Sequence, residues 1–83
     1  MTIIRMNLRD EYTEQFYREN GVFSIDDNVT GQDLINAVAN HINQDASYMQ
    51  LWFGSRPIYR RRTLRSQNAY DGMTINVGEA DDY

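Results

Sequence analysis

Few side chains in this 83-residue sequence could carry out acid–base or nucleophilic chemistry. His41 is the single histidine, and the sequence contains no cysteine that could join it as a nucleophile or as a zinc ligand. We expect His41 to pack near the C-terminal turn of a helix, where the helix dipole favours a cation. The sequence therefore predicts no catalytic residues, and we expect a protein that is not an enzyme.

One stretch has part of the spacing of a calcium-binding loop. Asp26, Asn28, Thr30 and Gly31 copy the start of such a loop. Its twelfth position requires a bidentate glutamate, and Ala37 occupies that position here. We therefore predict no metal site, and nothing in the sequence indicates a cofactor.

Five arginines and no acidic residue lie within one ten-residue stretch of an otherwise acidic chain, whose net charge is −4. They are Arg56, Arg60, Arg61, Arg62 and Arg65, and every basic residue of the chain is arginine rather than lysine. Guanidinium groups bind carboxylates and phosphates through paired hydrogen bonds. We therefore predict a contact with an acidic protein partner or a phosphate, made by Arg60, Arg61, Arg62 and Arg65; a solvated loop is the alternative. Because the chain is acidic and few aromatic residues lie among these arginines, we expect no nucleic acid partner.

The elements that must position these residues follow from hydrophobic periodicity. A helical period begins at Thr30, which with Asp33 forms an approximate capping box before Leu34 and Val38. Leu64 is the expected buried anchor of a mostly irregular stretch. The predicted order is β-β-α-β-β-β, with strands at 2–8 and 21–25, a helix from 30 to 43–45, and strands at 48–53, 58–59 and 73–77.

The length and composition indicate one domain, at 1–78, followed by an acidic flexible tail at 79–83. A membrane-spanning helix needs about 20 apolar residues, and the apolar runs here are much shorter, so we predict no membrane span. The first residues lack the long apolar segment of a secretory signal. Together with the absence of cysteine, this favours a cytoplasmic protein.

Two stretches of the sequence resemble the ubiquitin-like β-grasp pattern. They are VTGQDLINAVANHI and QLWFGSRPIYRRRTLRSQNAYDGMTINV. The shared features are a Thr-capped helix, a strand ending Leu-hydrophobic-Phe, a small-small-basic turn, Thr-Leu and a final strand of alternating hydrophobic residues. The pattern fits 30–78 without a gap, whereas the first hairpin matches only in type. The resemblance implies an α+β fold, in which a mixed sheet of four to five strands packs on one helix. We expect the first and last strands to be central and parallel.

Two departures from that pattern concern conjugation. Conjugated ubiquitin-like proteins end in an exposed Gly-Gly, whereas here Gly78 is single and directly follows the predicted last strand. The chain also lacks lysine, so no lysine-linked chain could grow on it. We therefore expect a stand-alone member that is not a covalent modifier.

The stretch YMQLWF contains adjacent large apolar residues, which strand parity separates onto two faces. Leu51 and Phe53 lie on one face and Trp52 on the other. The resemblance implies that Trp52 occupies the centre of the recognition patch of ubiquitin, with Asn76 and Gly78 at two further patch positions. The predicted partner-binding surface consists of Trp52, Gln50, Tyr48, Arg56, Pro57 and Asn76. The alternative is that Trp52 only covers the sheet, beneath the ring of Tyr48 or Tyr59.

The functional hypothesis is a non-conjugated ubiquitin-like interaction module or adaptor with a protein partner, present as a monomer or weak dimer. Three alternatives stay open. The first is an accessory subunit of a larger assembly, because stand-alone ubiquitin-like proteins occur in bacterial type VII secretion, multicomponent monooxygenases and pre-mRNA splicing. The second is an atypical conjugated modifier. The third is phosphate or RNA binding through the arginines at 60–65.

Overall fold

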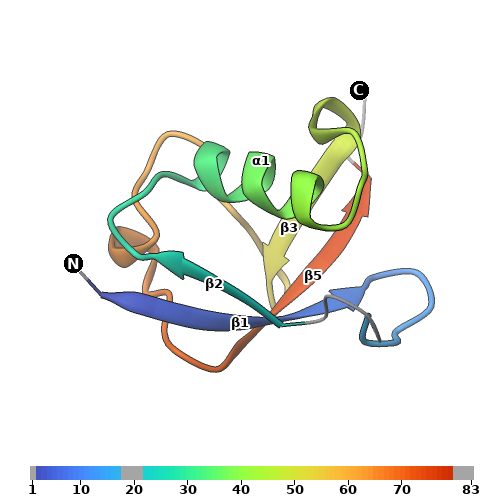
Figure 1. Cartoon of the computed structure of the whole chain (residues 1–83), viewed down its shortest axis with the longest axis horizontal. Helices are drawn as coiled ribbons and strands as arrows, with labels where there is room; N and C mark the ends of the chain where they lie inside the picture. Colours follow the sequence, from blue (N-terminus) through green and yellow to red (C-terminus); the bar gives the residue numbers. More distant parts are fainter. Residues whose placement is uncertain (1, 18–21, 80–83) are drawn as a thin grey trace.

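The computed structural model describes residues 2–17 and 22–79, which form a five-stranded sheet and an α-helix (Figure 1). Two short 3₁₀ turns, η1 and η2, connect the elements. In chain order these are β1 (Ile3–Asp10), β2 (Val22–Asp26), α1 (Gly31–His41), η1 (Ala46–Tyr48), β3 (Met49–Phe53), β4 (Arg56–Pro57), η2 (Arg65–Gln67) and β5 (Met73–Glu79).

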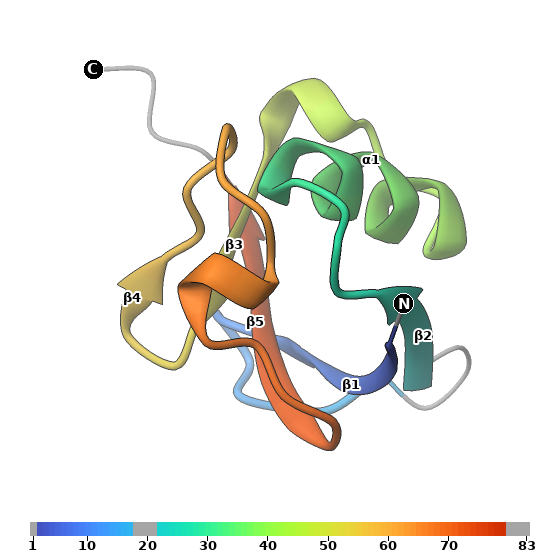
Figure 2. The same ribbon diagram turned by 90° about the vertical axis from the view of Figure 1, so that its left-hand side faces the viewer.

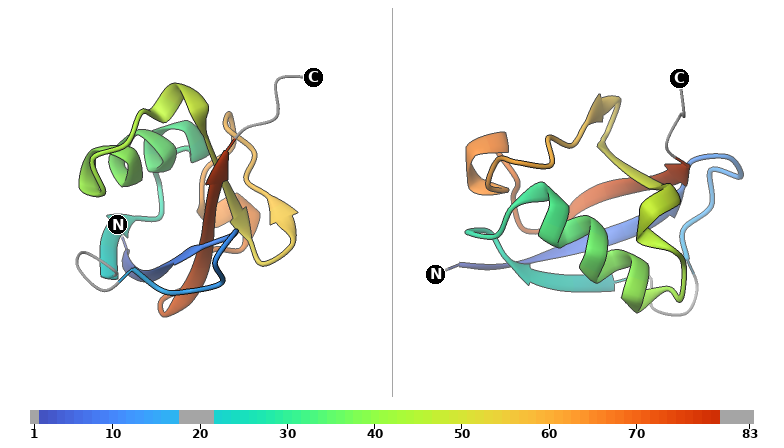
Figure 3. Two further views of the ribbon diagram at one scale, coloured as in Figure 1. Left: turned by 90° about the vertical axis from the view of Figure 1, so that its right-hand side faces the viewer. Right: turned by 90° about the horizontal axis from the view of Figure 1, so that it is seen from above.

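The centre of the sheet is the pair β1 and β5, which run parallel. The strand order is β2-β1-β5-β3-β4, and all other neighbours pair antiparallel. α1 lies across one face of this sheet (Figures 1 and 3). A mixed sheet packed on one helix confirms the predicted α+β class and the central, parallel placement of the first and last strands.

The start of α1 is fixed by a capping box, as predicted. The Thr30 hydroxyl accepts a hydrogen bond from the Asp33 amide at 3.2 Å, and the Asp33 carboxylate accepts one from the Thr30 amide at 3.1 Å. These two bonds satisfy backbone donors that the first turn leaves without helical partners. The helix ends at His41, slightly earlier than predicted, and Asn43 follows with a left-handed φ of 58°.

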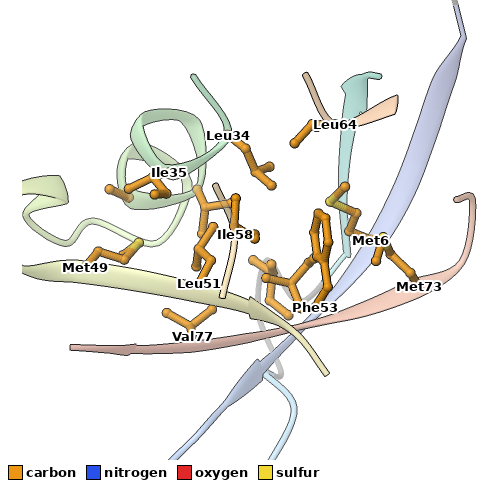
Figure 4. Packing of buried hydrophobic residues seen from close by; sticks show 14 of the residues in the cluster. Met6, Leu34, Ile35, Met49, Leu51, Phe53, Ile58, Leu64, Met73 and Val77 are labelled. Atoms are coloured by element: carbon orange, nitrogen blue, oxygen red, sulfur yellow. The ribbon is translucent and has the colours of Figure 1, made fainter. Parts of the chain in front are cut away.

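The hydrophobic core lies between α1 and the sheet (Figure 4). Every second residue of β1, β3 and β5 points toward the helix, so strand parity assigns the inward set correctly. Full burial of one such aliphatic side chain contributes about 1.5–3 kcal/mol. The core residues are Ile4, Met6, Leu8, Leu34, Ile35, Val38, Ala39, Met49, Leu51, Phe53, Ile58, Leu64, Met73, Ile75 and Val77.

The short return strand was predicted at 58–59 but lies at β4, two residues earlier. Ile58 is 4% exposed because its side chain enters the core, while its amide still donates to the Leu51 carbonyl at 3.1 Å. The next amide, that of Tyr59, turns away from the sheet and donates to the side chain of Gln67. A core anchor and a side-chain bond therefore end the strand pairing.

The last strand continues two residues beyond its predicted end and includes Gly78 and Glu79. Residue 21, at which the second strand was predicted to begin, and most of the predicted tail, residues 80–83, lie outside the described residues. Within 2–17 and 22–79, no helix is long and apolar enough to cross a membrane.

Candidate protein-interaction surface

One face of the sheet is turned away from α1 (Figure 2). Strand pairing sets one continuous row of residues from four strands across this face. Arg9 on β1 pairs with Asn76 on β5, which pairs with Trp52 on β3, which pairs with Pro57 on β4. We call these four residues the Trp52 row. Strand pairing thus places the Trp52 ring on the outer sheet face, between the middle strand β5 and the edge strand β4, where Pro57 is exposed.

Trp52 is half-buried, and the floor beneath its ring is Gly78 of β5. A Cβ atom added to Gly78 would lie 2.9 Å from Cζ3 and 3.3 Å from Cη2 of the Trp52 ring. The Glu11 carboxylate approaches the same point. The ring therefore rests against backbone that has no side chain, which holds it in place while it is still accessible.

Asn76 holds the row together through both ends of its amide. Its Nδ2 donates to the Gly54 carbonyl at 2.8 Å, and its Oδ1 accepts from the Arg9 guanidinium at 3.0 Å. Arg9 also lies 3.8 Å from Glu14. The network joins β1, β5 and the β3–β4 turn, so Asn76 positions the surface in addition to lining it.

Arg9 was not among the predicted site residues. Its outward parity on β1 could be read from the sequence, but its place beside Asn76 depends on the register of β1 with β5. A parallel pair between distant strands has no turn that would fix such a register.

The remaining predicted surface residues divide into two groups. Gln50 pairs with Gly78 and lies on the outer face, and Tyr48 in η1 is 62% exposed beside a depression of about 230 Å³ that Gly78 also lines. Arg56, in contrast, donates to the Gln67 carbonyl at 2.8 Å. Its guanidinium therefore points toward η2 and not toward Trp52.

The fold also divides the arginine cluster. Arg65 makes two hydrogen bonds to the nearly buried carboxylate of Asp27, at 3.3 and 3.2 Å, so an acid that is distant in the sequence neutralises it. Arg60 donates to the side chain of Gln32 at 2.7 Å and to the Met49 carbonyl at 3.1 Å. Arg61 and Arg62 are exposed, and Arg62 lies over a tyrosine ring.

Solved structures of ubiquitin-like domains are among those that have this architecture. The UBL domain of Plasmodium falciparum Dsk2 matches with a TM-score of 0.78 at 15% identity, covering 95% of this chain and 100% of that domain. A protein designed on the basis of ubiquitin matches with a TM-score of 0.78 at 12% identity, over 98% of this chain and 93% of the design. The chain has a ubiquitin-like β-grasp fold.

The N-terminal ubiquitin-like domain in the 4931431F19Rik protein matches with a TM-score of 0.77 at 16% identity. The match covers 98% of the present chain and 78% of the chain in that solved structure. No known protein family matches the sequence, and no curated protein sequence matches it. At these identities the likeness concerns the fold, because a fold of this kind carries many functions.

Hydrogen bonds and burial shift the pKa values of several side chains elsewhere in this ubiquitin-like domain. Hydrogen bonds from Arg5 lower the pKa of the Asp71 carboxyl, and hydrogen bonds from Ser47 lower the pKa of the Asp45 carboxyl. The pKa of the Tyr17 hydroxyl is raised, mainly by burial and also by the negative charge of nearby Asp10. The His41 ring packs edge-on against the Phe23 ring near the C-terminal turn of α1, and the two ring centres are 5.2 Å apart. Among the described residues, no three His, Cys, Asp or Glu side chains are grouped so as to hold a metal ion.

Proposed function

We propose that this protein is a non-enzymatic, stand-alone ubiquitin-like interaction module that binds a partner protein through the Trp52 row. The observation that carries the proposal is the half-buried Trp52, which rests on Gly78 on the sheet face that α1 leaves uncovered. A large, pre-positioned aromatic ring surrounded by polar groups is typical of an interface hot spot.

The polar surround is also fixed before a partner arrives. Asn76 is held by Arg9 and by the Gly54 carbonyl, so these groups need no reordering on binding. Pre-organised side chains lose less conformational entropy when an interface forms. The proposed surface consists of Trp52, Asn76, Arg9, Pro57 and Gln50, with Tyr48 at its border.

We propose further that the module works without conjugation through Gly78. A glycine used for conjugation must be accessible in an extended tail, whereas Gly78 lies within β5, pairs with Gln50 and supports the Trp52 ring. Release of Gly78 from the sheet would remove the floor of the proposed binding site.

The test is affinity purification of the tagged full-length protein, with partners quantified by mass spectrometry. Trp52→Ala should lower recovery of the main partner by about thirtyfold, because a hot spot contributes about 2 kcal/mol. Tyr70→Ala is the matched control, since Tyr70 is 62% exposed and lies outside the Trp52 row. Circular dichroism checks that both variants are folded.

Recovery of every partner at the wild-type level by folded Trp52→Ala would remove the proposed site. The intact mass of the purified protein is measured in the same experiment, and a covalent adduct through Gly78 would contradict the proposal that the module is not conjugated.

A further inference from the structure

A second surface is built by the segment that follows β4, which rises to the start of α1 (Figure 2). We call residues 58–62 the arginine loop. Its outer residues surround a shallow, mostly apolar hollow of about 460 Å³ that is lined by Ile58, Tyr59, Arg60, Arg61 and Arg62.

The backbone of the arginine loop is held by one buried side chain, that of Gln67, which is 4% exposed. Its Oε1 accepts from the Tyr59 amide at 2.8 Å. Its Nε2 donates to the carbonyls of Tyr59, Arg62 and Thr63 at 2.9, 3.1 and 3.3 Å. A single amide thus fixes both ends of a turn that has no strand pairing of its own.

The start of α1 holds the arginine loop from its other side. The amides of Gly31 and Gln32 donate to the carbonyls of Arg62 and Arg60, each at 2.9 Å. A Cβ atom at Gly31 would collide with the Tyr59 carbonyl, so the loop and the helix are in direct backbone contact. The loop is therefore a rigid platform, and its shape does not depend on a ligand.

This platform presents positive charge that no acid in the described residues neutralises. The ion pairs of the described residues are Arg5–Asp71, Arg9–Glu14 and Arg65–Asp27, and none includes Arg60, Arg61 or Arg62. Arg62 lies 5.5 Å from the centre of the Tyr59 ring, and Tyr59 is 54% exposed. Two exposed guanidinium groups, an aromatic ring and an apolar hollow are thus held side by side.

We infer that the arginine loop binds an acidic segment of a partner protein, with carboxylates on Arg61 and Arg62 and an apolar side chain in the hollow beside Tyr59. Guanidinium groups match carboxylates in geometry as well as in charge. The chain has a net charge of −4, so this loop is a positive patch on an otherwise acidic protein, and its charge complements that of an acidic segment.

Protein carboxylates fit this loop better than a nucleic acid does. A single-stranded nucleic acid needs a basic groove along its backbone and several stacking rings. The arginine loop offers two exposed guanidinium groups and one exposed ring, Tyr59, because Arg65 is paired with Asp27 and Arg60 is bonded to Gln32 and Met49. Two guanidinium groups and one ring are enough to contact a short peptide segment.

The probe is a ten-residue peptide with six glutamates around a central Leu-Phe pair, added to the ¹⁵N-labelled full-length protein. The expected result is a saturable shift of the 59–62 amide signals at peptide concentrations below 1 mM, weakened by salt because the charges are exposed. Arg61→Gln combined with Arg62→Gln should weaken binding by about tenfold, as expected for loss of two solvent-exposed ion pairs. Arg5→Gln is the control, since it removes an exposed guanidinium elsewhere, and it should change the affinity less than twofold.

Three results would overturn the inference. One is the absence of saturable shifts at 59–62, or equal shifts with a peptide in which glutamine replaces glutamate. Another is tighter binding of a ten-nucleotide oligouridylate, which would make the loop a nucleic acid site. The third is movement of the same amides when residues 80–83 are deleted without added peptide, which would assign the site to the chain's own acidic residues. None of these readouts involves Trp52, so failure here leaves the proposed function intact.

Discussion

The Trp52 row and the arginine loop both lie at the surface of the protein, but the fold positions them by different means. Strand pairing positions the Trp52 row, so the place of each residue in the row is set by strand parity and by the register of four strands. The arginine loop has no strand partner and depends on the side chain of Gln67 and on two helix amides. Regular backbone pairing supports the first surface, and individual side-chain bonds support the second.

This difference determines how each surface tolerates change. An outward residue on a strand can be replaced while the backbone pairing persists, because the ladder bonds do not involve side chains. A loop held by one buried amide loses its shape when that amide is removed, because several backbone groups then lack partners at once. We therefore expect the strands that carry the Trp52 row to keep their pairing when an outward residue is replaced. We expect the arginine loop to lose its shape when Gln67 is replaced.

The largest expected effect is that of Gln67→Ala on the arginine loop. It leaves the Tyr59 amide and the facing carbonyls without their partner in a buried position, which should lower the free energy of unfolding by about 2–4 kcal/mol. Urea denaturation measures this loss, and hydrogen exchange of the 59–62 amides reports the freed loop. Trp52 fluorescence of the folded variant should not change.

Gln15→Ala is the matched control for that variant, because Gln15 is exposed. A change of less than about 0.5 kcal/mol is expected for this surface substitution. Equal stabilities of Gln67→Ala and Gln15→Ala would contradict the role of Gln67 as the support of the loop.

An intermediate effect is expected for Gly78→Ala beneath the Trp52 row. The new methyl group would lie 2.9 Å from the Trp52 ring, so the ring must move outward. We expect a red-shifted fluorescence emission and a stability loss of about 1–2 kcal/mol from crowding. The same emission shift should appear in a Glu11→Ala background; its disappearance there would mean that Glu11, and not Trp52, is crowded.

The smallest effect concerns an exposed ion pair between β1 and the segment that precedes β5. Arg5 donates to the Asp71 carboxylate from its backbone amide at 2.7 Å and from its guanidinium at 3.3 and 3.2 Å, and these bonds lower the pKa of Asp71 below its usual 3.8. A lowered pKa in the folded state gives stability that is present above the unfolded pKa of 3.8 and is lost as pH falls through the lower folded value.

The melting temperature of the wild type should therefore fall more steeply than that of Asp71→Asn as the pH is lowered from about 5 to 3. Arg5→Gln should flatten the same part of the curve, because it removes the partner. Parallel curves for all three proteins would show that this surface contact contributes nothing measurable, as many exposed ion pairs do.

The sequence was sufficient to predict most of the fold. Alternation identified the inward residues of β1, β3 and β5, and the Thr30–Asp33 capping box located the start of α1. These features are local, because they depend on residues within a few positions of one another. The position of β4 was missed, since it depends on Ile58 entering the core and on Gln67 capturing the next amide.

The candidate surfaces were less predictable, for a related reason. Trp52 was placed correctly on the outer face, but Arg9 and the support from Gly78 follow only from the register of strands far apart in the chain. The stretch at 56–65 lacks acids, yet Asp27 reaches Arg65 from the loop before α1. Charge along a sequence does not show which charges meet in space.

The parallel pairing of β1 with β5 has a consequence for synthesis of the protein. Arg9 and Asn76, which meet in this pair, are 67 residues apart, so their contact closes a long loop and forms late. On the ribosome, β1 and β3 are made before the strand that lies between them. A nascent chain that stops before β5 lacks the middle of its sheet, and the β2-β1 and β3-β4 pairs then each expose an unpaired edge.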